Sequence, residues 1–212
     1  MKRRFLSHLA LCIAAVATLG AAPLVHAQDE APDALVKRLS SDVLDTIKAD
    51  KSYQTGDVSK IVSLVDSKIM PNVNFQRMTA SAVGPGWRQA TPEQQKRLQD
   101  EFKTLLLRTY SGALAQVSDQ SITVKPLRAA AGDTEVIVRT EIRGRGEPIQ
   151  LDYRLEKTAG QGAGWKIFNL NVLGVWLVET YRSQFAQEIN AKGIDGLITA
   201  LAERNKSNAK KV

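Results

Sequence analysis

Apolar residues recur at helical spacing through the first half of the chain. Between residues 32 and 50 they fall four positions apart with charged residues between them, which predicts an amphipathic helix: Leu35, Leu39, Val43 and Ile47. A second apolar stripe, 58–69, follows Asp57, a residue type that caps helix N-termini. Asn74 stands in the same way before a third, short helix, which the sequence Gly84-Pro85-Gly86 should end.

The segment 91–117 carries the clearest helix signal. Thr91-Pro92-Glu93-Gln94 combines a capping threonine, a proline at the first helical position and a glutamine that can close a capping box. Apolar residues then cover more than one side of the predicted helix. Such a helix packs against two layers, or against one layer and a ligand.

The period changes to two in the second half of the chain. Apolar and charged residues alternate, which predicts half-buried strands at 121–127, 134–143 and 148–157 and a further strand from Trp165. Short links between them favour an antiparallel meander. The expected fold class is therefore α+β, with a curved antiparallel sheet of about four strands packed against N- and C-terminal helices. The charged face of the sheet should meet solvent.

Helical spacing returns near the end of the chain. Leu177, Tyr181, Phe185 and Ile189 are four apart, and Gly193 suits the position after a helix. A further short helix is expected around 194–204. Residues 205–212 are basic and of low complexity, which predicts a disordered tail.

The N-terminus has the pattern of a secretory signal peptide. Lys2, Arg3 and Arg4 precede an apolar run, and Val25-His26-Ala27 forms a cleavage signal. The run is shorter than the roughly 20 residues of a spanning helix, and no later segment is long enough to span. We therefore expect a signal peptide at 1–27, export without stable membrane insertion, and one domain at 28–204.

Composition excludes several kinds of site from that domain. The only cysteine and histidines, Cys12, His8 and His26, all lie in the predicted signal peptide. The usual zinc sites and nucleophilic Ser-His or Cys-His chemistry are then excluded, and no metal or other cofactor is expected. Three of the 29 basic residues and none of the 22 acidic ones lie in the signal peptide, so the net charge of +7 falls to +4 after it. A nucleic-acid binder usually has a denser basic stripe.

An uncharged run extends from Ile167 to Val178. It could be a membrane anchor, ordinary core, or a wall that contacts an apolar ligand. Its length and the central Gly174 exclude the anchor.

Two blocks of residues resemble the signature of the MlaC family, the periplasmic phospholipid-binding or toluene-tolerance proteins. The first block is Gly164-Trp165-Lys166-Ile167-Phe168, Leu173-Gly174-Val175 and Tyr181-Arg182-Ser183-Gln184-Phe185. The second is Phe75, Met78, Gly84, Trp87-Arg88, Thr91-Pro92-Glu93-Gln94-Gln95, Phe102, Leu105-Leu106 and Thr109-Tyr110. The chain departs from the family at Asn74 and Asn169, where Asp is frequent, and at Leu173 and Trp176, which replace Glu and Ser.

The resemblance implies a fold that is NTF2-like in part, with a deep apolar cavity between sheet and helices and a bound phospholipid as cargo. It implies a periplasmic carrier that maintains outer-membrane lipid asymmetry. The implied partners are an outer-membrane lipoprotein–porin complex and an inner-membrane ABC transporter with a lipid-binding ring.

The apolar faces of the predicted strands and helices give the candidate lipid-binding residues. They are Phe75, Met78, Phe102, Leu105, Leu106, Tyr110, Val136, Val138, Ile142, Ile149, Leu151, Tyr153, Leu155, Val172, Val175, Trp176 and Tyr181. The alternative for each is ordinary core. Arg88, Arg143 and Arg145 are candidates for a lipid phosphate or for solvated surface charge. For Arg182 we expect a structural hydrogen bond or ion pair.

Two other function classes stay open on the residues alone. An enzyme with a buried carboxylate base is disfavoured, because the predicted inner faces of the strands carry no Asp or Glu. A chaperone or adaptor could bind lipoproteins or other proteins through an apolar groove. Co-purified lipid would favour the carrier over both.

Overall fold

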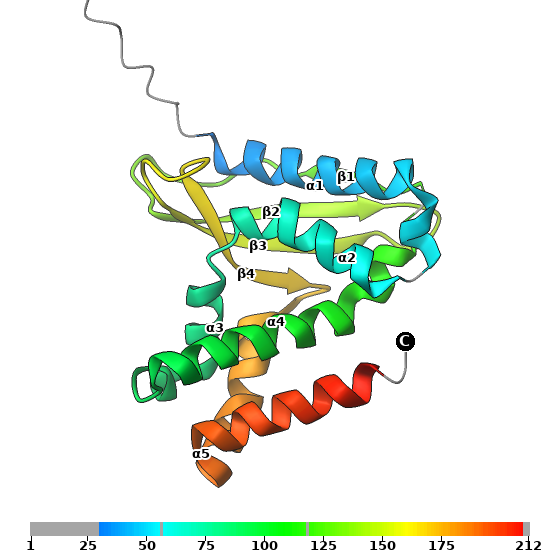
Figure 1. Ribbon diagram of the computed structural model, residues 1–212. Helices are drawn as coiled ribbons and strands as arrows, with labels where there is room; N and C mark the ends of the chain where they lie inside the picture. Colours follow the sequence, from blue (N-terminus) through cyan, green and yellow to red (C-terminus); the bar gives the residue numbers. More distant parts are fainter. Residues whose placement is uncertain (1–29, 56, 118, 210–212) are drawn as a thin grey trace, which may run out of the picture.

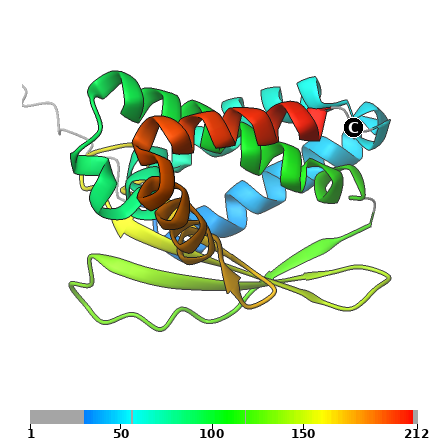
Figure 2. The same ribbon diagram turned by 90° about the horizontal axis from the view of Figure 1, so that it is seen from below.

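The protein is an antiparallel sheet with its helices gathered on one side (Figures 1 and 2). The computed structural model describes residues 30–55, 57–117 and 119–209. The predicted signal peptide lies outside the described residues. The helices are α1 Pro32–Ala49, α2 Val58–Leu64, α3 Phe75–Val83, α4 Pro92–Ala115 and α5 Leu177–Ala209, with short turns η1 Lys51–Thr55, η2 Val65–Ile69, η3 Met70–Asn72 and η4 Gly84–Arg88. The strands are β1 Ser121–Val124, β2 Glu135–Arg143, β3 Ile149–Lys157, β4 Trp165–Val172 and β5 Val175–Trp176.

The helices begin where the sequence predicts. Asp57 Oδ1 accepts a hydrogen bond from Ser59 N at 2.9 Å, and Asn74 Oδ1 accepts one from Arg77 N at 2.9 Å. Thr91 and Gln94 form the complete capping box at the start of α4. These bonds satisfy backbone donors that the first turn of a helix leaves without partners. Gly193, at φ 70°, kinks α5 at the predicted break between two helices.

The five strands pair in sequence order and all antiparallel. The inner face, which the helices cover, carries Val138, Tyr153 and Leu155, and register places Val138 beside Tyr153. Pairing between β3 and β4 shifts at Arg154/Leu155, so Phe168 and Asn169 both lie on the outer face. A fifth strand, absent from the sequence prediction, forms because Leu173-Gly174 turns the chain back and pairs Val175 with Val172.

Two expectations need correction. Residues 205–209 were expected in a disordered tail but continue α5, because buried Asn205 donates to the main-chain oxygen of Glu101 at 2.9 Å and to its carboxylate at 2.7 Å. The outer face was expected simply to meet solvent, yet Asp152, Asn169 and Asn171 on it are 4%, 1% and 4% exposed. Arg77 of α3 and Glu179 of α5 reach over this face and bond to its side chains.

Candidate functional site

The interior between sheet and helices is built from two clusters of buried apolar side chains. Cluster 1 joins α1 and α2 to the inner face of the sheet, and its members include Leu35, Ile47, Val138 and Leu155. Cluster 2 joins α3, α4 and α5 around Phe102, which is fully buried. The Phe102 ring centroid lies 4.9 Å from that of Tyr181 and 5.2 Å from that of Phe185, both edge-on. Each cluster is therefore a packed unit of its own.

The two clusters meet along β3 and β4, on a line that we call the seam: Val73, Leu151, Leu170 and Val172. Leu151 packs on cluster 1 and its cross-strand partner Val172 on cluster 2, while Leu170 and Val73 pack on both. All four side chains are only partly buried. The seam is therefore the candidate place for an apolar ligand, because close-packed cores resist insertion.

The seam runs out to one end of the sheet, where β2 and β4 finish and β3 begins (right-hand side of Figure 1). We call this the open end. Half-buried Ile142 and exposed Ile149 are cross-strand partners there, and exposed Val175 pairs with Val172 on the inner face. From α4, half-buried Leu106 and Tyr110 pack on cluster 2. Apolar surface thus continues from solvent at the open end into the seam.

The tyrosine side chains of the interior carry no charge. Burial raises the pKa of Tyr153, Tyr181 and Tyr110. A tyrosine phenol is already neutral at physiological pH, and this shift moves it further from ionisation. Tyr153 Oη lies 3.5 Å from Ser40 Oγ, within hydrogen-bond reach. An acyl chain beside these rings meets no formal charge from them.

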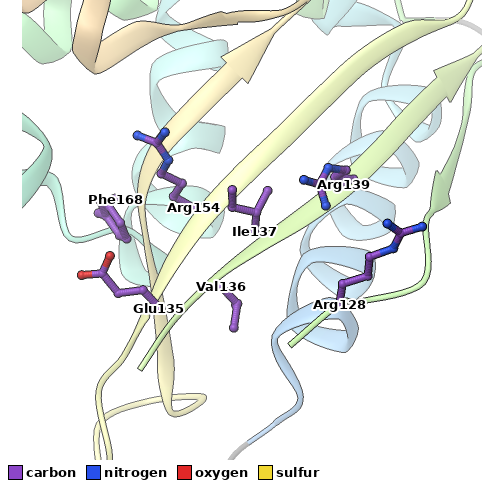
Figure 3. Close-up of a pocket in the computed structure, with 7 residues that line it drawn as sticks. All are labelled: Arg128, Glu135, Val136, Ile137, Arg139, Arg154 and Phe168. Carbon is purple, nitrogen blue, oxygen red and sulfur yellow. The ribbon is translucent and has the colours of Figure 1, made fainter. Parts of the chain in front are cut away.

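The outer face of the sheet carries charge instead (Figure 3). A surface pocket of about 440 Å³ lies on it, and its lining includes Arg128, Arg139 and Arg154 beside Ile137 and Phe168. The guanidinium carbon of Arg77 stacks 3.7 Å from the Phe168 ring centroid, and the Arg77 side chain pairs with Glu156 and Glu135 at 2.5 Å. This face is held by ion pairs and stacking, unlike the inner face.

Asn169 links the outer face of β4 to the start of α5. Its Oδ1 accepts hydrogen bonds from Leu170 N at 2.8 Å and Val178 N at 3.1 Å, and its Nδ2 donates to Glu179 at 2.8 Å. Arg154 also donates to Glu179 and stacks 4.0 Å from the Trp176 ring. Burial alone would raise the pKa of Glu179, but these hydrogen bonds outweigh it and the pKa lies below its ordinary value.

Glu179→Gln should make the free energy of unfolding less dependent on pH in the acid range. A carboxylate with a lowered pKa stabilises the folded state above its unfolded pKa of about 4.3, and this stabilisation is lost as pH falls through the folded value. The wild type should therefore lose stability below about pH 4 more steeply than the variant, as measured by urea unfolding at several pH values. Glu203→Gln, at an exposed position of the same helix, is the control. Parallel curves for wild type and Glu179→Gln would contradict the role of this carboxylate.

The predicted lipid-binding residues fall into three groups. Eight are buried in the two clusters: Met78, Phe102, Leu105, Val136, Val138, Tyr153, Leu155 and Tyr181. Eight are half-buried or exposed, and most of these lie along the seam and the open end: Phe75, Leu106, Tyr110, Ile142, Ile149, Leu151, Val172 and Val175. Trp176 stands apart, because its ring lies beside Arg154 on the outer face. The assignment of lipid contacts to these residues stays a prediction.

Sequence reasoning missed two seam residues. Leu170 could have been found, since it shares the inner face with Val172 at a spacing of two. Val73 had no such signal, because it stands alone between two helical turns, where it bridges to Ile167.

The candidate arginines lie at separate places on the surface. At the open end, Arg143 ends β2 and pairs with Glu141, and Arg145 lies in the β2–β3 loop and pairs with Asp119. Arg88 and Arg182 line a second surface pocket, of about 500 Å³, with Arg77 and Trp87. Arg182 Nε donates to the Ser81 oxygen at 2.8 Å, which is the structural hydrogen bond expected for it.

The geometry defines an α+β protein whose helices and sheet enclose two apolar clusters with a seam that reaches solvent. Comparison with known proteins gives the family. The model of the MlaC protein family matches residues 37–203, and the chain belongs to that family. No helix in the described part of the chain is both long and apolar enough to cross a membrane, and that part holds no group of His, Cys, Asp and Glu suited to a metal ion.

Individual relatives agree with this assignment. The toluene tolerance protein ttg2D of Pseudomonas putida is 28% identical over 178 residues, which cover 84% of this chain and 81% of the relative. The intermembrane phospholipid transport system binding protein MlaC of Haemophilus influenzae is 23% identical over 177 residues, with 82% of each chain covered. A solved structure of the phospholipid-binding protein from Ralstonia solanacearum, in complex with a phospholipid, has a TM-score of 0.80 and 49% identity, covering 84% of this chain and 98% of that one.

Proposed function

We propose that the protein is a phospholipid carrier that holds the acyl chains of its cargo in the seam, with the headgroup at the open end. The observation that carries the proposal is the likeness to the Ralstonia solanacearum phospholipid complex, at 49% identity over nearly all of that chain. The partly buried apolar seam and its continuity with the open end support the placement of the chains. The function is binding and transfer rather than catalysis.

The energetics explain what such a site must provide. Moving one 16-carbon chain from a membrane into water costs on the order of 13 kcal/mol, at about 0.8 kcal/mol per CH₂. A carrier offsets most of this by enclosing the chain in apolar surroundings. The seam lies between the two clusters and is only partly buried, so a chain placed there would meet apolar side chains of both.

The chain is similar to MlaC of Haemophilus influenzae, a binding protein of an intermembrane phospholipid transport system. This similarity supports a role in lipid transport between the two membranes. The protein would work in the periplasm after removal of residues 1–27. It would exchange lipid with an outer-membrane lipoprotein–porin complex and an inner-membrane ABC transporter, and so maintain outer-membrane asymmetry.

The test is transfer of a labelled phospholipid. Donor vesicles with a fluorescent phospholipid and unlabelled acceptor vesicles are separated by a dialysis membrane that passes the protein but not the vesicles. The carrier should speed the appearance of label in the acceptors in proportion to its concentration. Transfer no faster than without protein, together with no lipid in the purified protein, would contradict the proposal and favour the adaptor alternative.

A further inference from the structure

All three large apolar side chains that are exposed among the described residues gather at the open end. They are Ile149, Leu173 and Val175, which are 43%, 65% and 51% exposed. Leu173 N donates to Gln150 O at 3.0 Å, and Val175 pairs with Val172, so the three positions are neighbours. We call these three residues the apolar tip. Large apolar side chains exposed together, rather than scattered singly, mark an interaction site.

The turn that presents Leu173 is firmly built. Leu173 has φ 52° and is the one non-glycine residue with positive φ in the part of the chain that the structure describes. Asn171, itself buried, accepts a hydrogen bond from Gly174 N at 2.9 Å and fixes the turn. Asparagine or glycine would suit the Leu173 backbone better than leucine does. Stability of the turn therefore does not account for a leucine here.

We propose that the apolar tip inserts into the surface of a phospholipid bilayer while the carrier exchanges its lipid at that membrane; this rests on the function proposed above. The tip adjoins the seam directly, since Val175 pairs with Val172 and Val172 with Leu151. A lipid that leaves the bilayer at the tip would meet apolar side chains along its whole path.

The chemistry around the tip fits the surface of a bilayer. The tip is aliphatic and stands beside basic residues, and this combination of apolar and basic side chains binds the headgroup region of a membrane. Arg143 ends the adjacent strand β2 and Arg145 lies in the β2–β3 loop, and their side chains are 61% and 90% exposed. The ion pair of Arg145 with Asp119 lies at the surface, where such pairs contribute little, so the Arg145 guanidinium can turn to a lipid phosphate.

The test is binding to protein-free vesicles of phosphatidylethanolamine and phosphatidylglycerol, measured by co-flotation with the protein purified from the periplasm without detergent. Leu173→Asn removes the apolar side chain and suits the backbone of the turn, so the variant should fold as well as the wild type. It should bind at least about tenfold more weakly, the effect of losing one buried leucine. Leu173→Met, which keeps the apolar character, should bind nearly as the wild type does.

The lipid content of each preparation separates this proposal from the carrier function. Variants that still carry phospholipid but no longer float with vesicles would support the tip as the bilayer contact. Wild-type protein that carries lipid but does not bind vesicles would overturn the proposal, and the tip would then face a protein. Equal flotation of wild type and Leu173→Asn would overturn it as well.

Discussion

Replacing Leu151 by glutamate should empty the protein of lipid while leaving it folded. Leu151 is half-buried on the inner face, at the outer end of the seam beside Val172. Without lipid, the new carboxylate can reach water through the open end. With an acyl chain against it, the charge would be desolvated without a partner, which costs several kcal/mol. Lipid extracted from the purified variant should fall at least about tenfold.

The control for this variant lies on the opposite face of the same sheet. Ile137 is also a half-buried aliphatic residue, but it lines the outer-face pocket beside Arg128, Arg139 and Arg154 (Figure 3). Ile137→Glu introduces the same charge among guanidinium groups and should keep its lipid. Equal lipid content in Leu151→Glu and wild type, with circular dichroism unchanged, would contradict the placement of the acyl chains in the seam.

Phe102→Ala should give the largest loss of stability. Phe102 is fully buried at the centre of cluster 2, with the Phe75, Tyr181 and Phe185 rings within 5.8 Å of it, centroid to centroid. Truncation removes buried area and leaves a cavity, so the free energy of unfolding should fall by about 3–5 kcal/mol in urea titrations. Half-buried Phe75→Ala should cost clearly less. A loss below about 1 kcal/mol at Phe102 would mean that cluster 2 does not pack as described.

The sequence correctly predicts those parts of the fold that depend on residues close together in the chain. The capping box of Thr91 and Gln94 forms as expected, with hydrogen bonds of 3.2 and 3.0 Å, because all its atoms lie within one helical turn. The alternation along β2 and β3 correctly assigns Val138, Tyr153 and Leu155 to the inner face. These features depend on neighbours in the sequence.

The sequence prediction is wrong where the structure depends on contacts between residues far apart in the chain. The bulge at Phe168 and Asn169 follows from pairing with β3, and the uncharged run in which both lie gives no sign of it. The tail is helical at Asn205 because of a hydrogen bond to Glu101, more than a hundred residues away.

The arrangement of the candidate site also depends on contacts between residues far apart in the chain. Its residues follow from the apolar faces, but the division into two clusters with a seam depends on which helices pack together. In the sequence alone, Leu173 is only a departure from the family pattern. Its exposure and positive φ become visible only once β5 forms.

Native mass spectrometry of the intact protein is the direct test of phospholipid binding. The protein is purified from the periplasm without detergent and sprayed from a volatile buffer that preserves non-covalent complexes. The main species should be heavier than the polypeptide by the mass of bound phospholipid, which collisional activation releases. A main species at the bare polypeptide mass, unchanged after incubation with phospholipid vesicles, would contradict phospholipid binding.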